Sequence, residues 1–164
     1  MSETVEIRSP LSGTAVKLED VPDHVFADKM LGDGAAIQPA EGALYSPIDG
    51  EIVMIHESRH AYGIRGENGI ELMIHFGLET VYLKGEGFEA KVKAGDKVKA
   101  GDLLASVDLD LLKEKKLNTI TPVVVVSGAV PGSLKCNYGS VTHGDILMTC
   151  LPESAEEPAA EEPA

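Results

Sequence analysis

The sequence predicts an all-β domain, an antiparallel β-sandwich or barrel-sandwich with an internal pseudo-repeat and very little helix. Many of its 17 glycines and 9 prolines fall between short apolar runs, as in proteins with many turns and short strands. Hydrophobic residues make up 43% of the chain and aromatic residues 4%, so the core must be mostly aliphatic. The segment SPLSGTAV (9–16) returns as SPIDGEIV (46–53), and KAGD occurs twice within 93–102. Repeated segments that are so few and so unevenly spaced indicate a pseudo-symmetric β structure rather than a helical solenoid.

Each expected element rests on a local pattern. TPVVVV (121–126) is a continuous β-branched run, which predicts a strand buried on both faces, and Pro122 should mark the strand start or an edge. Each Gly-Asp pair, in KAGD and at 144–145, predicts a turn before a strand. The best helix candidate is 108–116, and a short turn is expected after Pro22. Alternation of apolar and polar residues predicts further strands at 13–18, 51–56, 60–65, 70–76, 102–107 and 145–150.

The length of 164 residues suits one domain. The last segment, PESAEEPAAEEPA (152–164), holds five glutamates and no apolar residue larger than alanine. Such a segment cannot offset its ordering entropy by burial. We therefore expect a folded domain at 4–151 and a disordered acidic tail at 152–164.

The charge balance excludes one class of partner. The chain carries 14 basic and 27 acidic residues, a net charge of −13, whereas nucleic-acid surfaces need clustered Lys and Arg. No basic, apolar leader opens the sequence, and no apolar run approaches the roughly 20 residues of a spanning helix. Cys136 and Cys150 match no CxxC pattern. These features favour the cytoplasm, reduced thiols and no direct membrane anchor.

The stretch ELMIHFG (71–77) places a histidine inside an apolar run. In a strand, Leu72, Ile74 and Phe76 would point to one face, which is the natural core face. His75 would then share the other face with Met73. A histidine buried only for packing would more often share the core face, so we expect His75 on a shallow surface with an open approach.

A hairpin turn at 66–69 would join the strand 60–65 to 70–76 and pair His60 with His75 across the hairpin. Two such imidazoles can lie close enough to ligate a metal or to hold one phosphoryl group. A zinc site needs a third or fourth ligand, which Asp145 or His143 could supply, although nothing in the sequence requires it. For phosphoryl capture two histidines suffice, one as neutral nucleophile and one as hydrogen-bond donor. Ser58 could add a hydroxyl donor.

Several motifs together resemble one family. They are PLSG (10–13), EDVPDHVFADKMLGDGAAI (19–37), SPIDG (46–50), RHA (59–61), ELMIHFGLETVYLKGEGF (71–88), GDKVKAGD (95–102), ITPVV (120–124) and GSVTHGD (139–145). In this order, they resemble the glucose-type enzyme IIA of the bacterial phosphoenolpyruvate-dependent sugar phosphotransferase system. The resemblance implies an antiparallel β-sandwich. It also implies that Nε2 of His75 takes a phosphoryl group from the phosphohistidine of the carrier HPr and passes it to a cysteine of a IIB domain.

The resemblance assigns further roles residue by residue. His60 matches the second family histidine, which holds the phosphoryl oxygens, and Ser58 keeps the hydroxyl of the family threonine. Glu79 keeps the charge of a family aspartate. Phe26 matches an exposed, partner-docking phenylalanine. Two other phenylalanines around the family site are replaced here by His56 and Met73, which changes the apolar rim and bears on partner choice.

Three other interpretations of the function remain open. Some family members bind and inhibit transporters or glycerol kinase, in one case through a shared zinc ion, and His60 and His75 could ligate zinc with a partner's ligand. A zinc hydrolase of the barrel-sandwich type is the main alternative, although such enzymes usually have an HxH pair and a secretory leader. A lipoyl- or biotinyl-type carrier would need a lysine on a hairpin tip, and no matching motif surrounds Lys84 or Lys97. The sequence does not identify the sugar.

Overall fold

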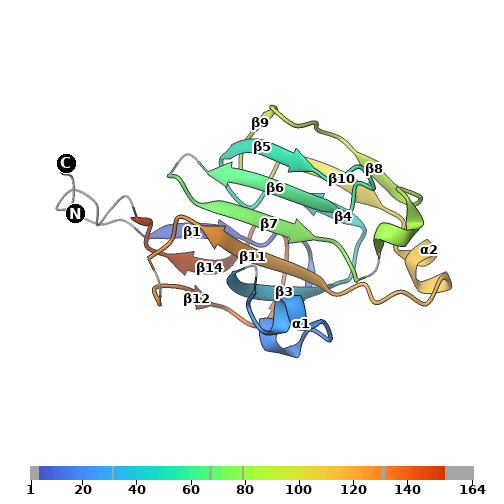
Figure 1. Cartoon of the computed structure of the whole chain (residues 1–164), viewed down its shortest axis with the longest axis horizontal. Coiled ribbons are helices and arrows are strands. Elements are labelled where there is room, and N and C mark those ends of the chain that lie inside the picture. The colour runs from blue at the N-terminus through green and yellow to red at the C-terminus, as the bar shows by residue number, and fades with distance from the viewer. Residues whose placement is uncertain (1–3, 31, 67, 79, 131, 154–164) are drawn as a thin grey trace.

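The computed structural model describes residues 4–30, 32–66, 68–78, 80–130 and 132–153. These residues form three sheets, and every recorded strand pair in them is antiparallel (Figure 1). The eight-stranded sheet contains, in spatial order, β13 (Gly139–Val141), β2 (Gly13–Lys17), β3 (Asp33–Pro39), β11 (Thr121–Ser127), β7 (Glu71–His75), β6 (Ala61–Gly66), β5 (Gly50–Ile55) and β9 (Lys97–Val98).

Two three-stranded sheets complete the β structure. One has the order β4 (Ala43–Tyr45), β10 (Leu103–Val107), β8 (Phe88–Ala90), and the other β1 (Val5–Arg8), β14 (Ile146–Cys150), β12 (Lys135–Cys136). The helical segments are short: α1 (His24–Ala27), α2 (Leu109–Glu114), and the 3₁₀ turns η1 (Leu18–Asp20) and η2 (Thr80–Leu83). The predicted all-β antiparallel class, with little helix, is confirmed.

The predicted elements coincide with observed ones to within one or two residues at most boundaries. The predicted strands correspond to β2, β5, β6, β7, β10, β11 and β14, the predicted helix contains α2, and α1 begins two residues after Pro22. Strand β3, with the sequence DGAAIQP, was not predicted. It lies between β2 and β11 and is therefore central, so its alanines are buried by tertiary packing that its own pattern does not reveal.

Strand β11 separates two hydrophobic clusters. Val123 and Val125 belong to the main core, whereas Val124 belongs to a second cluster that includes Leu18 and Phe26. The prediction of a strand buried on both faces is confirmed, and pairing to β7 starts at Val123, just after the proline. The second cluster packs the segment containing η1 and α1 onto the outer face of the large sheet, over β3 and β11.

The turns in the repeated sequence motifs are closed by the same pattern of hydrogen bonds. In each Gly-Asp turn the aspartate N–H donates to the carbonyl oxygen three residues earlier, at 3.0 Å for Asp96, 2.9 Å for Asp102 and 2.9 Å for Asp145. Each aspartate carboxylate accepts from the N–H of that same earlier residue. In the Ser-Pro motifs, Ser9 and Ser46 each donate a hydroxyl bond to the carbonyl two residues later. The repeated motifs therefore form structurally equivalent turns.

The C-terminal end of the described chain lies at one end of the sandwich (Figure 1). Pro152 forms an isolated antiparallel bridge with Ala129, and the Glu153 N–H donates to the Gly128 carbonyl at 2.7 Å. The sequence predicted a tail at 152–164, but residues 152 and 153 make these contacts and so belong to the folded domain, and the rest of the predicted tail, 154–164, lies outside the described residues. Among the described residues, no helix combines the length and the apolar character needed to cross a membrane.

Candidate functional site

The β6–β7 hairpin positions His75 at the last residue of β7. Leu72, Ile74 and Phe76 are buried in the main core, whereas His75 is half-buried on the opposite face. This is the predicted alternation. The cross-strand partner of His75 is Ala61, a small residue that is itself buried.

The predicted cross-strand pairing of His60 with His75 is wrong by one residue. The observed register pairs Ala61 with His75, because the turn closed by the Gly69 N–H and the Gly66 carbonyl at 3.0 Å is centred half a residue later than expected. The two imidazoles nevertheless lie together, with ring centroids 4.7 Å apart in an edge-to-face arrangement. The Phe76 N–H donates to the His60 carbonyl at 2.7 Å and extends the hairpin ladder to this point.

His60 is buried, with 3% of its surface exposed. Its Nδ1 atom is enclosed and has no hydrogen-bond partner among the described residues. A buried polar atom without a partner costs free energy and calls for an explanation, which is often a ligand or a functional role. Here the neighbour is the ring of His75, so the unpartnered nitrogen belongs to the same site.

The tautomer of His75 follows from one contact. Its Nδ1 lies 2.7 Å from the carbonyl oxygen of Gly77. A carbonyl oxygen accepts and does not donate, so Nδ1 must carry the proton and the neutral ring has its lone pair on Nε2. Gly77 has φ +77°, a conformation that favours glycine, and the Thr80 hydroxyl donates to the Phe76 carbonyl at 2.7 Å and stabilises this segment.

Burial keeps both histidines neutral near pH 7. Desolvation, with smaller contributions from His75 and His56, lowers the pKa of His60 to about 4. Desolvation also lowers the pKa of His75, and the hydrogen bond to Gly77 and the carboxylate of Asp23 partly oppose it. A neutral imidazole with a free Nε2 lone pair is the form that acts as a nucleophile.

Two of the other predicted site residues are found near the pair. Ser58 is buried, and its backbone N–H donates to Nδ1 of His56 at 3.0 Å. Met73 is half-buried, packs against the second hydrophobic cluster and shares the face of His75. Glu79 lies outside the described residues.

The predicted exposure of Phe26 is wrong. Phe26 is 5% exposed because it fills the second hydrophobic cluster, and its ring centroid lies 5.2 Å from that of His75. It therefore forms a wall of the site beneath the imidazole. The exposed apolar side chains of this segment are instead Val25, at 40%, and Met30, at 69%.

His56 also belongs to the site. Its ring centroid lies 4.6 Å from that of His60, so the three imidazoles lie in contact in the order His56, His60, His75. From the sequence, His56 was expected only at the apolar rim of the site, because it replaces a phenylalanine found there in the family. Its contact with His60 depends on the turn at 56–60, which no periodic pattern predicts.

The described residues offer no third protein ligand for a metal beside His60 and His75. In the described part of the chain, no three His, Cys, Asp or Glu side chains are arranged to hold a metal ion. His143 stacks on Tyr45 at 4.0 Å, and the Asp145 carboxylate accepts from the Thr142 N–H in its own turn.

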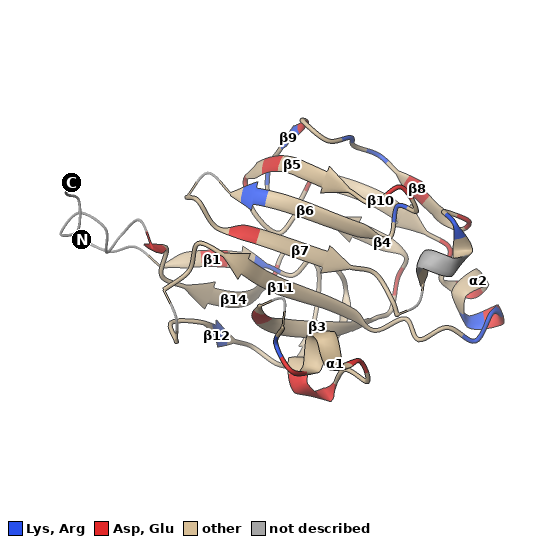
Figure 2. Ribbon diagram, in the orientation of Figure 1, with Lys and Arg blue, Asp and Glu red and all other residues tan. Residues whose placement is uncertain are grey.

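The charge distribution separates the site from the other end of the hairpin. Glu71 and Arg65 form an ion pair at 3.0 Å near the turn, whereas His75 ends the strand on the far side. Figure 2 shows charged residues at the turn ends of β6 and β7 and uncharged ribbon along the rest of both strands. The charged group that acts on the site is the Asp23 carboxylate, which partly opposes the lowering of the pKa of His75 by burial, in a chain of net charge −13.

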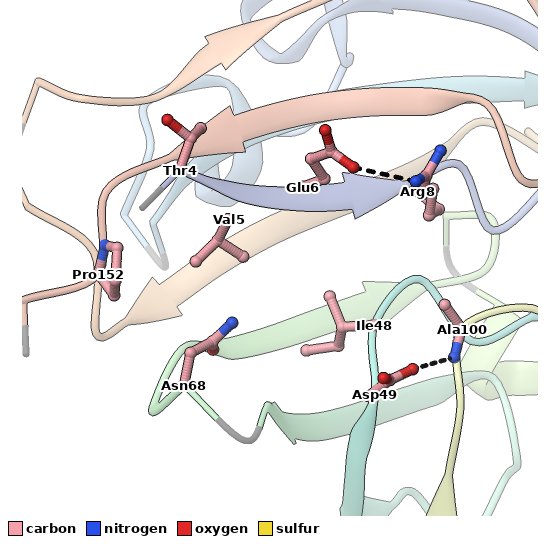
Figure 3. A pocket seen from close by; sticks show the side chains of 9 residues that line it. All are labelled: Thr4, Val5, Glu6, Arg8, Ile48, Asp49, Asn68, Ala100 and Pro152. Carbon is pink, nitrogen blue, oxygen red and sulfur yellow. Dashed lines mark hydrogen bonds and ion pairs between the residues drawn. The ribbon is translucent and has the colours of Figure 1, made fainter. Parts of the chain in front are cut away.

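A cavity of about 560 Å³ lies elsewhere, beside β1 (Figure 3). The Arg8 guanidinium there is paired with Glu6 at 2.9 Å, and the Asp49 carboxylate accepts from the Ala100 N–H at 2.8 Å. None of the three histidines lines it. Its charged groups already have partners, so it offers no competing anion site.

Comparison with known proteins shows the family of the chain. The family model described as phosphoenolpyruvate-dependent sugar phosphotransferase system, EIIA 1, matches residues 5–129. The chain belongs to this family. A glucose-specific EIIA component from Bacillus cereus is 52% identical to this EIIA-family chain over 133 residues, which cover 81% of each protein. One from Buchnera aphidicola is 43% identical over 150 residues, 92% of this chain and 93% of the relative.

Two further relatives extend the comparison. A glucoside-specific EIICBA component from Staphylococcus carnosus is 45% identical over 142 residues, which make up 87% of this EIIA-family chain and 20% of that longer protein. The solved structure of glucose permease IIA from Mycoplasma capricolum superposes with a TM-score of 0.83 at 34% identity, covering 90% of this chain and 96% of the other. The fold and the family agree in sequence and in structure.

Proposed function

We propose that this phosphotransferase-system EIIA protein is a phosphocarrier that receives a phosphoryl group on Nε2 of His75. The observation that carries the proposal is the bond between Nδ1 of His75 and the Gly77 carbonyl, which leaves the Nε2 lone pair free on a half-buried, neutral ring. In the first transfer, Nε2 attacks the phosphorus of the phosphohistidine of HPr. The new N–P bond forms as the old one breaks, and the electron pair returns to the imidazole of HPr.

In the second transfer a cysteine thiolate of a IIB domain attacks the same phosphorus. The N–P bond to His75 breaks and the ring regains its free lone pair, so the protein is regenerated without a cofactor. We propose that His60 donates a hydrogen bond to the phosphoryl oxygens, because it is the imidazole in edge contact with His75. The Ser58 hydroxyl is proposed as a second donor, since Ser58 is buried two residues before His60.

Both partners must reach the same face in turn. The outer face near His75 is partly apolar, through Met73 and Phe26, which suits transient interfaces near or below about 1,200 Å². We propose Met73 and the negatively charged Glu79 as partner contacts and Phe26 as the wall beneath His75. The fused EIICBA relative supports association with IIB and IIC domains. A cytoplasmic location follows from these partners and is part of the proposal.

Two finer roles are also proposals. The unphosphorylated protein would bind regulated transporters or kinases through the same face, and there His60 and His75 would share a zinc ion with a partner's ligand. The zinc-hydrolase alternative has no support, because the described residues contain no group of three metal ligands and the chain belongs to the EIIA family.

The experiment that tests the proposal is phosphoryl incorporation in a reconstituted system. Phosphoenolpyruvate with a labelled phosphoryl group, enzyme I and HPr should label the wild-type protein. The variant His75→Gln should remain unlabelled, and His143→Gln, which removes an imidazole away from the site, should be labelled normally. Labelling of His75→Gln at the wild-type rate would overturn the assignment.

A further inference from the structure

His56 uses three polar groups to close one turn. Its N–H donates to the Ala61 carbonyl at 2.9 Å, and its carbonyl accepts from the Arg59 N–H at 2.7 Å. Its ring Nδ1 accepts from the Ser58 N–H at 3.0 Å. Nδ1 must hold a lone pair to accept this bond, so the neutral ring carries its proton on Nε2. The turn at 56–60 is therefore organised around one side chain.

This turn determines on which face of the sheet the His60 side chain lies. Ala61 is the residue opposite His75, so strict strand alternation would send the neighbouring His60 side chain to the other face of the sheet. The ring of His60 instead lies 4.7 Å from that of His75. The chain departs from the strand pattern at Arg59, which has φ +61°, a left-handed conformation that a non-glycine residue keeps only when its surroundings impose it.

The His56 ring also contacts His60, the residue that ends this turn. Its centroid lies 4.6 Å from that of His60, and the two planes are tilted by 55°. His60 thus lies in contact with His56 and with His75 and is 3% exposed. The contact restricts the orientation of a ring whose own Nδ1 has no hydrogen-bond partner in the part of the chain that the structure describes.

We propose that His56 is a positioning residue for His60. By accepting the Ser58 N–H and packing on the His60 ring, it holds the left-handed turn that brings His60 against His75. The inference rests on the proposed phosphocarrier function, because the role of His60 is to hold the phosphoryl group. It assigns a specific task to a residue that differs from the aromatic rim expected from the family resemblance.

The test compares two amides that differ by one methylene. His56→Asn places a side-chain oxygen where Nδ1 lies, so it can accept the Ser58 N–H as in an Asx turn. His56→Gln carries its oxygen farther from the backbone and cannot close the same ring. Phosphoryl uptake from phospho-HPr and transfer to the IIB domain are measured separately. We expect His56→Gln to slow transfer to IIB by about 3- to 10-fold, the effect of losing one hydrogen bond, and His56→Asn to recover most of the loss.

A double-mutant cycle shows whether His56 acts through His60. In a His60→Gln background, His56→Gln should have little further effect on transfer, whereas independent roles would give multiplied losses. Equal transfer rates for the wild type, His56→Asn and His56→Gln would overturn the inference, as would multiplied losses in the double variant. Failure of the wild-type protein to take up phosphoryl on His75 would instead overturn the proposed function, so the two failures are distinguishable.

Discussion

At the residue scale, the site depends on small geometric facts around two imidazoles. The Gly77 carbonyl fixes the tautomer of His75, and burial keeps His60 neutral. The sequence predicted the face of His75, because strand alternation is a local property. It did not predict that Phe26 is buried, since that depends on how α1 packs on the sheet.

His60→Gln should separate the two transfer steps. The nucleophile His75 and its Gly77 contact remain, so uptake from phospho-HPr should continue. Transfer to IIB should fall by about 10-fold or more, because a hydrogen bond to a charged phosphoryl oxygen contributes about 1.5–3 kcal/mol. Quench-flow measurement of each step checks this. Normal transfer to IIB by the variant would refute the role of His60.

At the element scale, the β6–β7 hairpin and the turns that flank it build the site. Turn residues at Gly66 and Gly69 were visible in the sequence, but not the half-residue difference in the centre of the hairpin, which moved the partner of His75 from His60 to Ala61. The two histidine rings still lie close together, because the left-handed conformation of Arg59 returns the His60 side chain to the face of His75. Such an irregular turn leaves no periodic signal.

Gly77→Ala should disturb both stability and function. Gly77 has φ +77°, and an added Cβ would lie 2.7 Å from Cγ2 of Thr80 and 3.1 Å from the Asn118 carbonyl oxygen. We expect a loss of about 1–3 kcal/mol in unfolding free energy, and slower phosphoryl uptake because the carbonyl that holds His75 must move.

Gly69→Ala is the matched control. Gly69 has φ +90°, but an added Cβ would meet no atom within 4 Å, and the residue lies at the far end of the hairpin. It should lower stability through backbone strain and leave uptake unchanged. Denaturant titration and the labelling assay distinguish the two variants. Equal uptake by both would show that the position of the Gly77 carbonyl does not matter.

At the scale of the whole molecule, the sandwich holds a buried histidine at a stability cost that depends on pH. The pKa of His60 is about 4 in the folded protein against an ordinary value of 6.5. Between these values the unfolded chain binds a proton that the folded protein does not, so the unfolding free energy falls as the pH falls from 6.5 to 4. The difference amounts to about 3 kcal/mol for this residue once the pH is below 4.

His60→Gln should therefore flatten the acid side of the stability curve. At pH 7 the ring is neutral in the folded protein and mostly neutral in the unfolded chain, so it contributes little to the pH dependence there. At pH 4.5 the wild type should have lost more stability than the variant, relative to pH 7. Thermal or urea unfolding at the two pH values measures this. Parallel pH dependences in the two proteins would contradict the burial effect.

The domain boundary is a whole-molecule prediction that the sequence suggested from composition alone. The last described contacts are the Pro152 bridge to Ala129 and the Glu153 bond to Gly128. Removal of 154–164 should leave the melting temperature within about 2 °C, because these contacts remain. Truncation after Cys150 removes them, along with the Leu151 carbonyl that accepts from Val130, and should lower the melting temperature clearly. A large loss on removing 154–164 would show that the tail belongs to the fold.

The most direct test of the central claim is nitrogen and phosphorus NMR of the phosphorylated protein with labelled histidine rings. We expect one phosphoryl group, bound to Nε2 of His75, with Nδ1 still protonated and directed at the Gly77 carbonyl. A phosphoryl group on Nδ1 of His75, or on His60 or His56, would contradict it.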